Sequence, residues 1–185
     1  GAALLAGADC FFIDCSGTND FKPDFNSVPK KIWQNCQILV LCSPSNPTGV
    51  CLTIEEFETA LGLAEKYDFL ICSDECYIDI YSSNEKPPKS LLNVGESLNL
   101  SSRTIVFHSL SKRSNLAGLR SGFVCAHEQI IEKVHLYRTY NGVTLPLPSQ
   151  AASAWAWKDQ AHVEENRLSY DEKFNSALIH LKNLK

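Results

Sequence analysis

The feature that most constrains the fold is a series of short apolar runs, each almost continuous in hydrophobicity and bounded by turn residues. They cover residues 10–15, 38–42, 69–73 and 104–108. Strands that alternate apolar and polar residues usually cover one face of a sheet, whereas continuous apolar strands are typical of a parallel sheet covered on both faces. These runs therefore predict the buried strands of a mostly parallel sheet.

Helical patterns separate the strands. Between the second and third runs, Thr53 and Glu56 have the spacing of a capping box, in which two side chains satisfy backbone amides of the first helical turn. Apolar residues then recur at helical spacing on one face: Ile54, Phe57, Leu61 and Ala64. A strand, a helix and a strand in this order predict a βαβ unit with a right-handed crossover.

The alternation continues in the second half of the chain. A strand is predicted over residues 121–126, a helix over residues 128–137, and a further helix from about Ser149. From residue 161 to residue 185 a helical pattern carries apolar residues at regular spacing: Phe174, Leu178, Leu181 and Leu184. The predicted fold class is α/β, with three layers in which helices lie on both faces of a mostly parallel sheet.

Composition excludes several classes of protein. Hydrophobic residues make up 44% of the chain and charged residues 21%, which is typical of globular proteins. A length of 185 residues indicates one domain, or one domain with part of another. No apolar run approaches the roughly 18 residues that a membrane span needs. Seventeen basic residues against 21 acidic ones disfavour a nucleic acid or an anionic membrane as the partner.

The eight cysteines do not indicate a metal site. They contain no CxxC pair, and no histidine lies at a zinc-ligand spacing from a cysteine pair. Most of them fall inside the predicted strands, where a free thiol packs as a small apolar group. Since no secretory signal is visible at the start of the sequence, reduced thiols and a cytoplasmic location are expected.

The two ends of the sequence have the character of internal segments. The chain contains no methionine and starts on small apolar residues without a charged leader. Its last residues continue a helical pattern without a glycine or proline stop. We therefore expect the chain to be an internal piece of a longer protein.

Polar and charged residues follow three successive predicted strands. They are Asn46, Asp74, Tyr77, Ser109, Lys112 and Arg120. Taken singly, they have ordinary interpretations: a turn for the Asn-Pro-Thr-Gly segment, a helix cap for the acidic pair after residue 73, and a solvated loop for the serine-rich segment. Ligands of open α/β sheets bind outside the carboxyl ends of the strands, however, so the joint occurrence of these residues predicts a shared site.

The residue types match the needs of one cofactor, pyridoxal phosphate. The cofactor requires a lysine amine that holds it as an imine, and Lys112 can supply this amine. It also requires a carboxylate that keeps its ring nitrogen protonated, and Asp74 can supply this group. When a substrate amine replaces Lys112, the released lysine is the natural general base and acid for the proton shift.

The remaining residues complete the predicted cofactor site. Asn46 and Tyr77 can hydrogen-bond the phenolic oxygen of pyridoxal phosphate. Ser109 and Arg120 can bind its phosphate group, because a guanidinium binds phosphate as a bidentate fork. The sequence thus predicts catalytic roles for Lys112 and Asp74 and a cofactor-binding role for all six residues.

Three stretches of the sequence resemble the signature stretches of class I/II aminotransferases, which are pyridoxal phosphate enzymes of fold type I. They are residues 43–49 (SPSNPTG), 73–77 (SDECY) and 109–123 (SLSKRSNLAGLRSGF). Their order and approximate spacing also match. Within the family, several stretches are similar to bacterial succinyldiaminopimelate aminotransferases: residues 108–114, 118–123, 137–142, 145–150 and 162–167.

The resemblance implies a domain organisation. Residues 1–158 would form the cofactor-binding large domain, truncated at its N-terminal side, and residues 159–185 a long helix that leads to a small domain outside the chain. The family's glycine-containing phosphate turn and ring-stacking aromatic would precede Gly1, and its arginine for the substrate carboxylate would follow Lys185. The resemblance also implies a homodimer with residues of both subunits in each active site. A chain of this extent is expected to be an incomplete, inactive piece.

The implied reaction moves an amino group between an amino acid, expected to be glutamate, and a keto acid. The similarity to succinyldiaminopimelate aminotransferases implies N-succinyl-diaminopimelate:2-oxoglutarate transamination in lysine biosynthesis. Two alternatives stay open. The first is a lyase or synthase of the same fold, which would share the cofactor site. The second is an aminotransferase-like regulatory module, which would bind the cofactor or an amino acid without turnover and would carry an attached DNA-binding domain.

Overall fold

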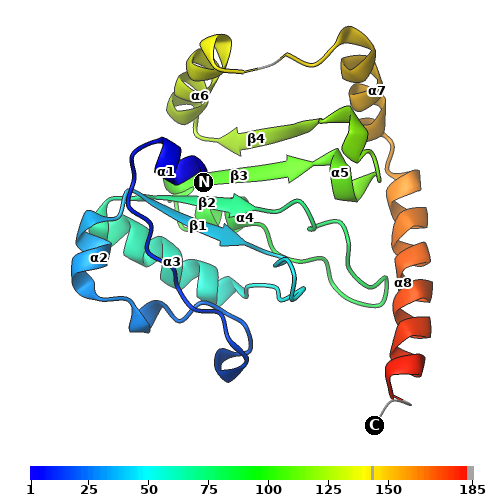
Figure 1. Ribbon diagram of the computed structural model, residues 1–185, viewed down its shortest axis with the longest axis horizontal. Coiled ribbons are helices and arrows are strands. Elements are labelled where there is room, and N and C mark those ends of the chain that lie inside the picture. Colours follow the sequence, from blue (N-terminus) through cyan, green and yellow to red (C-terminus); the bar gives the residue numbers. More distant parts are fainter. Residues whose placement is uncertain (143, 183–185) are drawn as a thin grey trace.

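The centre of the molecule is a mostly parallel sheet. The computed structural model describes residues 1–142 and 144–182, and within them it has one four-stranded sheet with the order β1-β2-β3-β4 (Figure 1). The strands are β1 (Ile38–Cys42), β2 (Leu70–Asp74), β3 (Thr104–Ser109) and β4 (Gly122–Ala126). β1, β2 and β3 are parallel, and β4 runs antiparallel to β3. The prediction of an α/β fold with a mostly parallel sheet is confirmed.

Helices alternate with the strands along the chain. They are α1 (Ala2–Leu5), α2 (Lys30–Asn35), α3 (Ile54–Tyr67), α4 (Leu91–Ser97), α5 (Leu110–Arg113), α6 (Glu128–Tyr140), α7 (Leu147–Lys158) and α8 (Ala161–Lys182). The helices predicted after residues 53, 127 and 148 correspond to α3, α6 and α7. The helix predicted over residues 161–185 corresponds to α8, and the part of that prediction after residue 182, with Leu184, lies outside the described residues.

The hydrophobic core lies between the sheet and helices α2, α3 and α4. On α3, Phe57 and Leu61 are fully buried against Ile71 of β2 and Val106 of β3. The stacked rings of Trp33 on α2 and Phe69 before β2 extend the core, with their centroids 5.6 Å apart. Burial of such side chains stabilises the fold by about 1.5–3 kcal/mol each, so this core holds the parallel strands in register.

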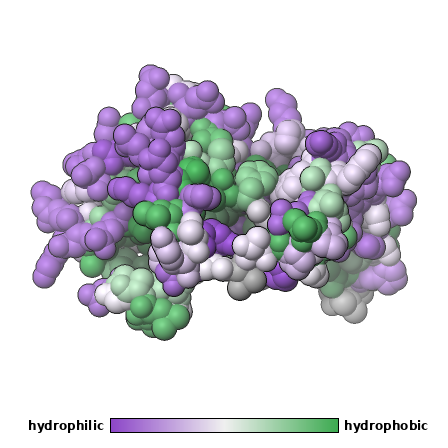
Figure 2. Space-filling model, turned by 90° about the horizontal axis from the view of Figure 1, so that it is seen from above, coloured by the Kyte–Doolittle hydropathy of each residue, from purple (hydrophilic) through white to green (hydrophobic). Residues whose placement is uncertain are grey.

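The opposite face of the sheet carries apolar side chains that stay exposed to solvent. Ile38 and Val40 on β1 and Phe107 on β3 are 53%, 72% and 41% exposed. Apolar side chains also form separate patches between polar ones on the side of the molecule seen from above (Figure 2). The continuous hydrophobicity of β1 thus comes from two apolar faces, of which α2, α3 and α4 cover one.

The strand predicted over residues 10–15 is wrong. Residues 10–15 have no regular secondary structure, and Phe12 is 86% exposed. Strands need a neighbouring strand for their backbone hydrogen bonds, and within the described residues this run pairs with none. The buried thiols expected here are also wrong, because Cys10 and Cys15 are exposed, whereas Cys42 and Cys72 are half-buried. All eight cysteines are free.

The capping box of α3 gives a direct test of local stability. Glu56 N donates to Thr53 Oγ1 at 3.3 Å, and Thr53 N donates to Glu56 Oε2 at 2.7 Å, as the sequence predicts. We expect Thr53→Ala to lower the free energy of unfolding by about 1 kcal/mol, because one backbone amide of the helix loses its acceptor. Urea unfolding measures this loss. Thr53→Ser is the control, and an equal loss in both variants would contradict the capping role.

Helix α8 lies on the side of the molecule where the three parallel strands end (Figure 1). In Figure 1 it runs along the side to which the arrowheads of β1, β2 and β3 point. Its apolar residues Phe174, Leu178 and Leu181 are more than half exposed. Among the described helices, none has both the length and the apolar character needed to cross a membrane. The division into a large domain over residues 1–158 and a connecting helix stays a prediction.

Candidate active site

The loops that follow the three parallel strands begin in register. Beyond the paired ends of β1 and β2, Ser43 N donates to Asp74 O at 3.1 Å. In the same way, Glu75 N donates to Phe107 O of β3 at 3.0 Å. Backbone hydrogen bonding therefore brings the three loops with the predicted site residues to one edge of the sheet, as expected for parallel strands.

Asn46, Tyr77 and Lys112 lie together at this edge. Asn46 Nδ2 donates to the phenolic oxygen of Tyr77 at 3.4 Å. The Nζ atom of Lys112 lies 5.6 Å from the centroid of the Tyr77 ring, within range of a cation–π contact. Loops that follow three different strands thus bring an amide, a phenol and an amine into one group, and Lys112 itself is exposed.

Asp74 ends strand β2 and supplies the negative charge of the site. Its Oδ1 atom accepts a hydrogen bond from Cys76 N at 3.0 Å, which fixes the carboxylate at the strand end. Burial, together with Asp74, raises the pKa of the Cys76 thiol to about 12, and the charge of Lys112 opposes this shift. Cys76 is therefore a neutral thiol beside a carboxylate and an amine of opposite charge.

Ser109 and Arg120 lie on adjoining segments. Ser109 Oγ accepts from Ser111 N at 3.1 Å, which caps α5, and its hydroxyl lies 3.3 Å from Ser121 O, next to Arg120. Arg120 has a φ of 53°, and its Nη1 donates to Ala117 O at 3.0 Å. Gly122 permits β4 to approach β3 closely at this point, since a Cβ at residue 122 would lie 2.5 Å from His108 O.

A buried acid and a histidine, which the sequence analysis did not identify, lie next to Asp74. Glu75 is fully buried, and its Oε1 atom accepts from Leu91 N at 2.9 Å. His108 Nε2 lies 3.5 Å from Glu75 Oε2, which is longer than an ordinary hydrogen bond. Burial raises the pKa of Glu75 and lowers the pKa of His108, so both groups shift towards their neutral forms.

Arg113, the neighbour of Lys112, also escaped the sequence analysis. It is 7% exposed, and its Nη1 atom donates to Ala156 O at 2.8 Å. Its Nη2 atom donates to Gln160 Oε1 at 3.0 Å. Its Nε atom also lies 3.4 Å from Asp79 Oδ2. A Lys-Arg pair in a serine-rich loop reads as solvated, and these three partners lie 34 to 47 residues away, so local sequence carries no signal for this burial.

The arrangement has a definite chemical capacity. An exposed amine, a carboxylate and a phenol–amide pair lie at one edge of the sheet, and a hydroxyl and a guanidinium lie on the adjoining segments. Such a set can bind an anionic aromatic carbonyl compound, with the amine near the carbonyl and the guanidinium near the anion. Among the described residues, no group of three or more His, Cys, Asp or Glu side chains could hold a metal ion.

Known proteins of similar sequence and structure share one family. An aminotransferase from Neisseria meningitidis is 40% identical with a TM-score of 0.89, over 95% of this chain and 44% of that one. A probable N-succinyldiaminopimelate aminotransferase from Thermus thermophilus is 28% identical with a TM-score of 0.86, over 99% and 48%. LL-diaminopimelate aminotransferase 2 from a Nostoc strain is 31% identical over 84% and 39%.

The chain spans less than half the length of these three relatives. The family model for aminotransferase class I and II matches residues 2–184. This match covers nearly every residue of the chain, including all six predicted site residues. The enzymes of this family depend on pyridoxal phosphate, as the resemblance of the three sequence stretches implies. On this match and on the similarity to the aminotransferase structures, the chain belongs to the class I and II aminotransferase family.

Proposed function

We propose that this chain forms the cofactor-binding part of a pyridoxal phosphate-dependent aminotransferase. The observation that carries the proposal is the group of Lys112, Tyr77 and Asn46 at the edge of the sheet where Asp74 ends β2. The amine, phenol, amide and carboxylate are the groups that this cofactor needs, and they come from three loops that begin in register.

Each residue has a proposed role. Lys112 would hold the cofactor covalently through its amine, and Asp74 would pair with the ring nitrogen. Asn46 and Tyr77, which already share a hydrogen bond, would bind the phenolic oxygen. When bound, pyridoxal phosphate supplies an electron sink for the α-carbon of an amino acid.

Two further roles follow from the adjoining loop. Ser109 and Arg120 would bind the phosphate group through a hydroxyl and a guanidinium. Lys112, once free of the cofactor, would remove and return the proton at the substrate α-carbon.

The proposed substrates are glutamate and a keto acid, in N-succinyl-diaminopimelate:2-oxoglutarate transamination of lysine biosynthesis. The name of the Thermus relative supports the succinylated substrate, and the name of the Nostoc relative supports a diaminopimelate substrate without the succinyl group. Family resemblance supports the proposed homodimer and a large domain over residues 1–158 followed by a connecting helix. The eight free cysteines support the proposed cytoplasmic location.

A screen of amino donors and keto acceptors with the intact protein tests the proposed function. We expect glutamate to change the absorbance of the bound cofactor, and 2-oxoglutarate to reverse the change. Borohydride reduction followed by peptide mapping should place the pyridoxyl group on Lys112. Label on another lysine would contradict the assignment of this residue. Keto acid and ammonia released without amino transfer would favour a lyase, and cofactor binding without turnover would favour a regulatory module.

A further inference from the structure

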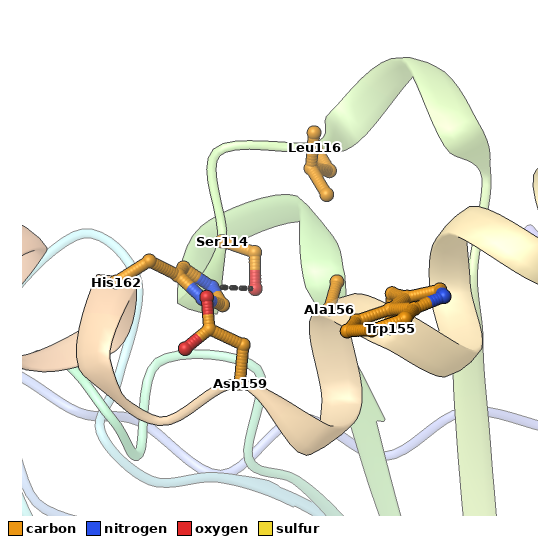
Figure 3. A pocket seen from close by; sticks show the side chains of 6 residues that line it. All are labelled: Ser114, Leu116, Trp155, Ala156, Asp159 and His162. Carbon is orange, nitrogen blue, oxygen red and sulfur yellow. Dashed lines mark hydrogen bonds and ion pairs between the residues drawn. The ribbon is translucent and has the colours of Figure 1, made fainter.

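A hydrogen-bonded chain of three polar side chains lies where α5, the helix that carries Lys112, meets the junction of α7 and α8. Asp159 Oδ2 lies 2.9 Å from His162 Nδ1, and His162 Nε2 lies 2.8 Å from Ser114 Oγ (Figure 3). The three residues border a cavity of about 200 Å³ together with Leu116, Trp155 and Ala156. None of the three belongs to the proposed cofactor site.

Asp159 holds one end of this hydrogen-bonded chain in place. Its Oδ1 atom accepts from Ala161 N at 3.0 Å, so the carboxylate also caps the start of α8. The hydrogen bond from His162 is the largest cause of the lowered pKa of Asp159. Since Asp159 binds both the backbone and the ring, the imidazole is held with its Nε2 atom towards Ser114.

Ser114 links His162 to α5, the helix that carries Lys112. It is the C-cap of α5, and its backbone N donates to Leu110 O at 3.1 Å. Helix α5 has four residues, which is too short to be stable without tertiary contacts. The direction of Lys112 therefore depends on what anchors the end of α5.

Arg113 and Asn115 attach the same segment to the same junction. In addition to its bonds to Ala156 and Gln160, Arg113 lies 5.2 Å from the centroid of the Trp157 ring. Asn115 Nδ2 donates to Asn166 Oδ1 of α8 at 2.8 Å. Residues 113, 114 and 115 thus each contact α7, α8 or the segment between them, directly after Lys112.

We propose that the hydrogen-bonded chain from Asp159 through His162 to Ser114 positions Lys112 for the amino-transfer reaction. The inference rests on the proposed function and assigns His162 as a positioning residue that acts through Ser114. The hydrogen-bonded chain fixes the end of α5, so that the amine of Lys112 stays over the Tyr77 ring. Small displacements of a reacting group can lower the rate by about a hundredfold.

The decisive experiment compares variants of His162 in the intact protein. We expect His162→Leu to lower kcat about tenfold or more while KM changes less than about twofold, because Lys112 is misdirected. We also expect the pH midpoint of the absorbance change of the bound cofactor to shift by about half a unit or more, since the amine moves relative to charged neighbours. His162→Gln should restore most of both values, because its amide can hydrogen-bond Ser114.

A matched control lies on the same helix. His180 is exposed, and its Nδ1 atom lies 2.7 Å from Ser176 O on α8 itself. His180→Leu should change neither kcat nor the pH midpoint. Ser114→Ala should lower kcat at least as much as His162→Leu, because it also removes the acceptor of Arg113 Nη1 at 3.4 Å. The double variant should be no worse than Ser114→Ala alone, since both substitutions remove the contact between Ser114 and His162.

Specific outcomes would contradict the positioning role of His162. It is overturned if His162→Leu leaves kcat and the pH midpoint unchanged, or if the effects of Ser114→Ala and His162→Leu simply add. An Asp–His–Ser order also occurs in hydrolases, so the wild-type protein is treated with a fluorophosphonate probe and mapped. Label on Ser114 would overturn the positioning role in favour of a nucleophile. Absence of amino transfer in the wild type would instead contradict the proposed function.

Discussion

Replacing Lys112 with arginine is expected to lower the rate of amino transfer in the intact protein about a thousandfold or more. Arginine keeps the positive charge over the Tyr77 ring, where the lysine Nζ lies 5.6 Å from the centroid. It cannot form the covalent link to the cofactor, and it stays protonated, so both the nucleophile and the general base are lost. Such a fall corresponds to roughly 4 kcal/mol in the barrier.

Steady-state kinetics with saturating pyridoxal phosphate measures this effect. Lys133→Arg on α6 is the control, because this exposed lysine lies on another element, and its variant should retain normal turnover. The cofactor absorbance of Lys112→Arg should resemble that of free pyridoxal phosphate. Turnover within about tenfold of the wild type would show that another amine carries the cofactor.

Asp74→Asn is expected to retain some cofactor but to lose amino transfer by one to two orders of magnitude or more. An amide cannot stabilise a protonated ring nitrogen, and the loss of a charge-assisted hydrogen bond costs about 1.5–3 kcal/mol. The substitution should also lower the pKa of Cys76 from about 12, because the charge of Asp74 is one of its causes. Thiol titration therefore reports whether the local geometry survives.

The control for Asp74 is Asp68→Asn, just before the start of the same strand. The Asp68 side chain is 89% exposed, and Asp68 has a φ of 60°, which asparagine adopts readily. Its variant should transaminate at the wild-type rate. Near-normal turnover in Asp74→Asn with a lowered pKa of Cys76 would mean that another residue serves the ring nitrogen.

The parts of the fold that depend on local pattern could be predicted from the sequence. Strands β1 and β3 and the capping box of α3 follow from apolar runs and from a three-residue spacing. The run at residues 10–15 has the same local pattern, but a strand also needs a partner, which local pattern does not specify. The antiparallel direction of β4 likewise depends on the connection that carries α5.

The candidate site could be predicted only in part for a similar reason. Asp74 is the last residue of β2, and Asn46 and Lys112 follow the ends of β1 and β3, so the topology of a parallel sheet brings them to one edge. Arg113 and His162 are recognisable only through partners at long range, since Arg113 binds Gln160 47 residues away and His162 binds Ser114 48 residues away. Sequence periodicity carries no information about such contacts.

The short antiparallel return from β3 to β4 has a consequence for the order of folding. Ser109 and Ser121, next to Arg120, meet across 12 residues, whereas Asn46 and Tyr77 are 31 residues apart. Closing the shorter loop costs less entropy, so the segment with Lys112 can form early as a local unit. Tyr77 and Asn46 can join it only after three parallel strands have assembled. Cofactor capture during refolding would therefore report the last step of sheet assembly.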